Sequence, residues 1–153
     1  MSPVQDQSDP TVEPGAGVAV GESPTIAALT GPVARWIYAI PFLMFGIMHF
    51  VMTERMTGVV PQWMPGAYFW VYFTGVAHIA AAIAIASNRL IRLAGILLAI
   101  MLLTFVFTVH LPGVLNPETM AASMTSLLKD TALAGGALMA AHFASHREEE
   151  AEA

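Results

Sequence analysis

The 153-residue sequence contains no cysteine, and only 11% of its residues are charged. The absence of cysteine excludes disulfides, thiol chemistry and thiolate metal sites within this chain. It also excludes redox membrane proteins that work through cysteine pairs as functional models. Soluble domains carry about 25% charged residues. With 56% hydrophobic residues, this chain has too few charges to cover a surface in water, so we expect lipid to be part of its solvent.

Several functional patterns are also missing. The net charge is −5 and the acidic residues lie mostly near the two ends of the chain, so the sequence predicts no nucleic-acid partner. It has no H-E-x-x-H motif, no phosphate-binding glycine loop, and no serine or cysteine nucleophile with a partner base. We therefore expect no metal site, and whether the protein is an enzyme stays open.

Long apolar runs dominate what is present. The first follows Arg35 and stays uncharged up to Glu54, close to the ~20 residues that a helix needs to cross the ~30 Å hydrocarbon core. Three more runs follow, of which the last is the weakest by hydropathy. The four predicted spans are residues 33–52, 68–86, 91–109 and 123–143. The predicted fold class is therefore all-α, a transmembrane four-helix bundle.

Both ends of the chain differ from this central part. Residues 1–30 contain acidic residues and prolines but no lysine or arginine, and such a segment buries too little apolar surface to offset its ordering entropy. We expect a disordered tail over residues 1–30, a four-span domain over residues 31–145, and a solvated acidic tail over residues 146–153.

The basic residues near the span ends predict the orientation. With four spans, one side of the membrane would hold Arg35, Arg89, Arg92 and Arg147. The other side would hold only Arg55 and Lys129. We therefore expect a multi-pass protein of the cell membrane with both termini in the cytoplasm.

Ionisable residues within the spans form the candidate site. When the helices are placed in alternating directions, these residues gather in the outer half of the bundle, with Glu54 and Arg55 at the rim. The cluster consists of His49, His78, His110, Lys129 and Asp130. Ionisable groups within a membrane are costly, and they usually face the bundle interior or a functional cavity.

Structural roles account for the same residues in another way. His49 and His110 stand at span ends, where a histidine can reach the headgroups. His78 can be a hydrogen-bonded structural residue. Lys129 and Asp130 can mark a helix start, where a negative charge is favourable.

Two further patterns concern the histidines. Gly46 and His49 share a G-x-x-H spacing with Gly75 and His78, which would place each glycine one turn from its histidine and let a flat ligand approach the backbone. Haem ligation by His49 and His110 is allowed by counting alone, and the pattern does not favour it.

A third pattern is a small-residue stripe in the last span. Ala132, Gly136, Ala140 and Ala144 recur every four residues. Small residues of this spacing let membrane helices approach closely, so we expect this stripe to face another helix and not lipid.

The order and spacing of the short motifs resemble the DoxX family of small four-helix membrane proteins, over residues 35–141. The motifs are R-W-x-Y-x-x-P-x-L-x-F-G-x-x-H-F, V-P-x-W-M-P-x-x-x-F-W-V-Y-x-T-G, N-R-x-x-R-x-A-G, H-L-P and L-x-K-D-x-A-L-A-G-G-A-L. Members often carry a glutamate at the position of His78, which is a departure in this chain.

The resemblance implies a small subunit of a membrane-associated, quinone-linked redox complex. Some proteins of that family accompany a thiosulfate:quinone oxidoreductase. A quinone head would then enter the bundle, its carbonyls bound by His49, His78 or His110, while a soluble or membrane-bound redox partner supplies electrons. The alternatives are a noncatalytic membrane scaffold and a small-solute carrier that uses the same polar cluster.

Overall fold

A computed structural model describes residues 23–152, and for residues 147–152 it gives only the course of the backbone. All regular structure in this part of the chain is helical, as the sequence predicted. In chain order the helical segments are α1 (Pro24–Ala28), the π-helical turn η1 (Leu29–Val33), α2 (Ala34–Val51), α3 (Thr53–Thr57), α4 (Ala67–Ala86), α5 (Ile91–Phe105), the π-helical turn η2 (Val106–His110), α6 (Leu111–Val114) and α7 (Met120–Glu152).

The first helix begins earlier than the sequence predicted. The Ser23 side chain accepts a hydrogen bond from the Ile26 amide, and Pro24 occupies the first helical turn. Both are favoured at a helix start. Residues 24–30 are therefore helical within the segment that we expected to be disordered, because a local cap outweighs its average composition. The rest of that segment, residues 1–22, lies outside the described residues.

Three helical stretches in the described part are long and apolar enough to cross a membrane. They are Pro24–Val51, Ala67–Ala86 and Ile91–Val114, and they cover the first three predicted spans except for Met52. The fourth predicted span, residues 123–143, lies within α7 and is not among them. Lys129, Asp130 and many small or hydroxyl-bearing residues lower its hydropathy. α7 also continues to Glu152, so the segment expected to be an acidic tail is helical in its backbone.

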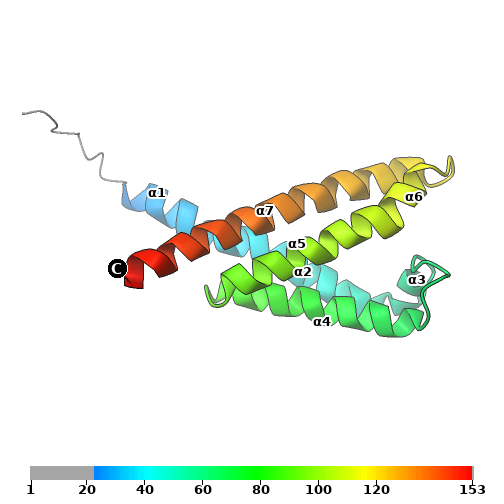
Figure 1. Ribbon diagram of the computed structural model, residues 1–153, viewed down its shortest axis with the longest axis horizontal. Coiled ribbons are helices and arrows are strands. Elements are labelled where there is room, and N and C mark those ends of the chain that lie inside the picture. The colour runs from blue at the N-terminus through cyan, green and yellow to red at the C-terminus, as the bar shows by residue number, and fades with distance from the viewer. Residues whose placement is uncertain (1–22, 153) are drawn as a thin grey trace, which may run out of the picture.

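The long helices form two packed pairs. α2 lies along α4, α5 lies along α7, and the contact between α4 and α5 joins the pairs. Figure 1 shows α3 and α6 at one end of the molecule, and α1, the C-terminus and the α4–α5 turn at the other. This turn is tight because Asn88 and Leu90 adopt φ angles of 58° and 54°, a region that asparagine tolerates better than most residues.

Glycines allow the close approach within each pair. A methyl group at Gly46 would lie 2.9 Å from the carbonyl oxygen of Gly75, and one at Gly95 would lie 2.5 Å from that of Ala137. Both distances are too short for real carbon atoms, so only glycine fits. Small residues serve this purpose in membrane helices, where no hydrophobic drive holds helices together.

The small-residue face of α7 differs from the predicted stripe. Gly136 does face another helix, because a methyl group there would lie 3.0 Å from the Tyr38 ring. Ala132 is exposed, however, and the buried alanines include Ala134 and Ala137. A spacing of four residues rotates by about 40° per step on an α-helix, so the stripe is exposed at Ala132 and buried at Ala144.

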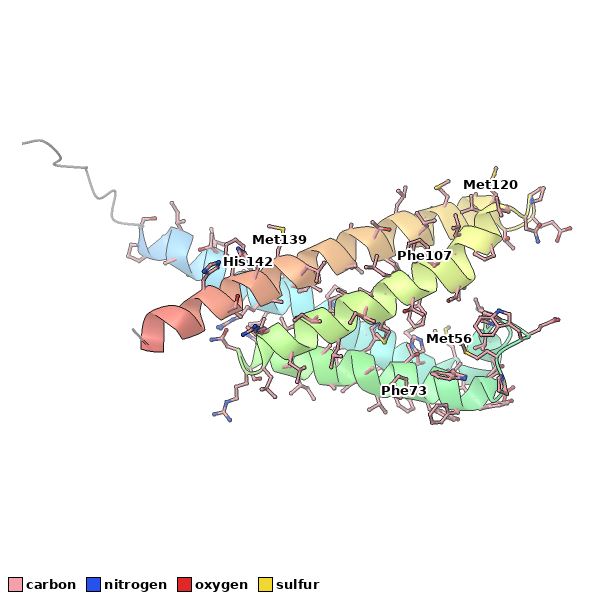
Figure 2. The ribbon with its side chains drawn as sticks, in the orientation of Figure 1. Met56, Phe73, Phe107, Met120, Met139 and His142 are labelled. Carbon is pink, nitrogen blue, oxygen red and sulfur yellow. The ribbon has the colours of Figure 1, made fainter. Side chains whose placement is uncertain are left out.

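The outer faces of the long helices are apolar. Ile37 of α2, Phe73 of α4, Phe107 of η2 and Met139 of α7 are each more than half exposed. Figure 2 shows Met120 and Met139 on the outward side of α7. Contiguous apolar surface of this extent marks contact with lipid or a partner. The described chain is thus a helical membrane protein, in which His78 and Asp130 are buried ionisable residues.

Candidate functional site

Two histidines from the α2–α4 pair lie side by side. His49 is in the last turn of α2 and His78 is in the middle of α4, and their ring centroids are 5.3 Å apart. The glycines of the two G-x-x-H motifs bring them together, because Gly46 and Gly75 pack against each other one turn away. The expectation that these glycines leave room for a flat ligand is therefore wrong, since the neighbouring helix fills the space.

Backbone hydrogen bonds define the tautomer of each histidine ring when it is neutral. Nδ1 of His49 lies 2.7 Å from the carbonyl oxygen of Phe45, and Nδ1 of His78 lies 3.0 Å from that of Thr74. A carbonyl oxygen only accepts, so Nδ1 donates in each ring, and Nε2 of the neutral ring is an acceptor. Among the described residues, neither Nε2 has a hydrogen-bond partner, although His78 is only 3% exposed.

The α5–α7 pair contributes a buried carboxylate with two basic partners. Asp130 of α7 is 3% exposed. Its two oxygens lie 2.8 Å from Nε2 of His110 and 3.0 Å from Nζ of Lys129. His110 ends the π-helical turn η2, and such turns are often found at functional sites. Both partners donate to the carboxylate, which satisfies a charge that would otherwise be costly in an apolar interior.

Phe45 connects the two halves. Its ring lies edge-on to His78 with a centroid distance of 6.1 Å, and Nζ of Lys129 lies 4.5 Å from its centroid. The five predicted site residues thus lie in one continuous chain of contacts. The chain has two chemical parts, neutral acceptors on the α2–α4 pair and a compensated ion cluster on the α5–α7 pair, with an aromatic ring between them.

Sequence reasoning missed three neighbours of the site. Phe45 belongs to no polar pattern, and its place one turn before His49 was the available signal. Thr53, buried one turn after His49, donates its hydroxyl to the His49 carbonyl at 2.7 Å. At the rim, Glu54 accepts a hydrogen bond from the Tyr68 hydroxyl at 2.8 Å.

A pocket lies around the junction of α2 and α3. Its volume is about 440 Å³, and its lining includes Phe50, Thr53, Glu54, Arg55 and Tyr72. Neither histidine lines it, but Thr53 does, and the Thr53 hydroxyl donates to the His49 carbonyl.

The pair of histidines that the sequence allowed as haem ligands is not brought together in the structure. His110 is bonded to Asp130 and His49 pairs with His78, so the two histidines considered for haem do not face each other. His142 contacts His146 at a centroid distance of 4.5 Å, on the last turns of α7 and away from the cluster. The described residues contain no group of three or more side chains placed to hold a metal ion.

Comparison with known proteins gives one match. Residues 38–127 match the family described as "Domain of unknown function (DUF8561)", which covers more than half of the chain and includes His49, His78 and His110. No curated protein and no solved structure matches the chain. The function therefore has to be inferred from the residues and their geometry.

Proposed function

The chain belongs to the DUF8561 family, and we propose that it is a four-span membrane protein that serves a quinone-linked redox complex as a small proton-handling subunit. The buried cluster of His49, His78, His110, Lys129 and Asp130 would be its working site. The order of motifs that resembles the DoxX family supports the redox assignment, and the geometry of the cluster supports the proton-handling role.

The fourth span of this proposal is α7. Its 33 residues extend about 50 Å, which exceeds the thickness of the hydrocarbon core. Leu128, Met139 and Phe143 on its outward side are at least 60% exposed, while Asp130 is buried. This arrangement suits a helix that faces lipid on one side and a polar site on the other. The excess of arginines at the α1 end then favours both termini in the cytoplasm.

The observation that carries the proposal is the free Nε2 of His78. This atom has no hydrogen-bond partner among the described residues, although His78 as a whole is only 3% exposed, so it is available to accept a hydrogen bond from a ligand or to take up a proton. The neighbouring Nε2 of His49 adds a second acceptor on the adjacent helix. An imidazole can take and release a proton, as can the glutamate that members of the DoxX family often carry at this position.

The same geometry modifies the expected mode of quinone binding. Quinone carbonyls need donors, but both Nδ1–H groups of the histidine pair are bonded to the backbone of their own helices. Their Nε2 atoms can instead accept hydrogen bonds from the hydroxyls of a hydroquinone. The proposed ligand in direct contact with His49 and His78 is therefore the reduced form, and a partner protein would exchange its electrons because this chain has no cysteine.

Purification in mild detergent, followed by solvent extraction and chromatography, tests the proposal. We expect quinone to copurify with the wild type and with a His146→Gln control. His78→Gln should fold but lose any partner-dependent activity, because an amide keeps hydrogen bonds but does not titrate. A wild-type protein without quinone, whose partner-dependent activity survives His78→Gln, would refute the redox role and favour a scaffold.

A further inference from the structure

An apolar groove lies on the outer face of the α2–α4 pair, near the end where α2 begins and α4 ends. Its volume is about 410 Å³. Ala39 and Ala82 form its floor, because they are at most 3% exposed, and Trp36 and Ile83 stand as walls that are more than half exposed. The groove ends at Ser87, the residue after α4. This shape fits an extended hydrocarbon chain.

Two arginines stand at the same end of the helix pair. Arg35 lies one turn before Ala39 on the same face of α2, and its Nε is buried without a hydrogen-bond partner. Arg89 is exposed in the α4–α5 turn, two residues after Ser87. None of the described carboxylates forms an ion pair with either arginine. The apolar groove therefore ends beside two uncompensated guanidinium groups, one of which has an unused buried donor.

We propose that this groove binds a phospholipid with an anionic headgroup. One acyl chain lies in the groove against the alanine floor, and the phosphate binds Arg35 and Arg89. Guanidinium groups match phosphate oxygens with two parallel hydrogen bonds. A headgroup with net negative charge is favoured over a zwitterionic one because neither arginine has a counter-ion among the described residues.

This site is independent of the proposed redox role. The groove lies at the α1 end of the molecule, whereas the histidine pair lies toward α3, as the course of α2 in Figure 1 shows. A lipid in the groove would bridge the outer surfaces of α2 and α4 where no loop joins them. It would therefore stabilise the α2–α4 pair without contact with His49 or His78.

The test compares phosphatidylglycerol with phosphatidylcholine of the same acyl chains, added to delipidated protein in detergent. Thermal unfolding and native mass spectrometry report stabilisation and stoichiometry. We expect phosphatidylglycerol to bind with one lipid per chain at saturation and to raise the unfolding temperature more than phosphatidylcholine does. One interfacial arginine contributes about 1 kcal/mol to binding of anionic lipid, so Arg89→Gln should weaken the apparent affinity about fivefold.

Three further variants make the outcome decisive. Arg35→Gln should weaken the binding of phosphatidylglycerol at least as much as Arg89→Gln does. Ala86→Leu narrows the groove and should weaken the binding of both lipids. Arg55→Gln removes an arginine at the opposite end and should have no effect. Equal binding of the two lipids, or an equal loss in Arg55→Gln and Arg89→Gln, would show unspecific attraction of lipid to basic residues and would overturn the proposal. Because Arg89 is exposed, its variant remains a test even if Arg35→Gln does not fold.

Discussion

Replacing Gly95 with alanine should separate α5 from α7. The added methyl group would lie 2.5 Å from the carbonyl oxygen of Ala137 and 3.1 Å from the Ala141 side chain. The carbonyl belongs to the α7 backbone and cannot rotate away, so the two helices must move apart. Overpacking of this kind costs about 1–3 kcal/mol, whereas alanine gains up to about 1 kcal/mol in helix propensity over glycine. We expect a net loss of up to about 2 kcal/mol in the free energy of unfolding.

Gly135→Ala provides the matched control. Gly135 lies inside α7, and an added methyl group would find no other atom within 4 Å. The same substitution there brings the propensity gain without the clash, so its stability should rise by about 0.5–1 kcal/mol. Circular dichroism during thermal unfolding in detergent should rank Gly135→Ala above the wild type and Gly95→Ala below it. A Gly95→Ala variant as stable as Gly135→Ala would refute the close contact between α5 and α7.

Three other predictions concern the contacts between the helix pairs and the orientation. Tyr38→Phe removes the hydroxyl that donates to the Leu133 carbonyl, and it should lower the unfolding free energy by about 1 kcal/mol in chemical denaturation; an unchanged midpoint would contradict this bond. Asp130→Asn should lower the unfolding free energy more than Tyr38→Phe does, since charge-assisted hydrogen bonds contribute about 1.5–3 kcal/mol each. The contribution of the bond to Lys129 is smaller because that side chain is nearly half exposed. A smaller effect than that of Tyr38→Phe would show that the carboxylate is not paired. A reporter fused at Asn88 should give a cytoplasmic signal, and an extracytoplasmic signal would reverse the proposed orientation.

The sequence predicted the helices well because the length of an apolar run is a property of the chain alone. The α4 and α5 boundaries follow the predicted spans closely, since the polar turn between them interrupts both the hydropathy and the helix. The N-terminal start was missed because it depends on one cap, in which Ser23 bonds the Ile26 amide. α7 is ambiguous in hydropathy because Lys129 and Asp130 are counted as solvent-exposed charges, although Asp130 is buried and paired.

The sequence could predict how deep each site residue lies in the membrane, but not which residues contact each other. A helix rises by 1.5 Å per residue, so counting from the span ends places a side chain along the membrane normal. Which residue it meets depends on the rotation of each helix about its axis. His49 therefore pairs with His78 and not with His110, which binds Asp130. Phe45, which lies between the two groups, carries no polar signal that would have identified it.

The division of the cluster between the two helix pairs bears on how it would work. Asp130 has both of its partners, His110 and Lys129, within its own pair, so its hydrogen bonds do not depend on the histidine pair. The two histidines likewise bond backbone carbonyls of their own helices through Nδ1. Phe45 contacts both groups, because its ring packs against His78 and the Lys129 ammonium lies 4.5 Å from its centroid. In the proposed proton-handling role, Phe45 is therefore the residue whose movement would bear on proton transfer between the histidines and Asp130.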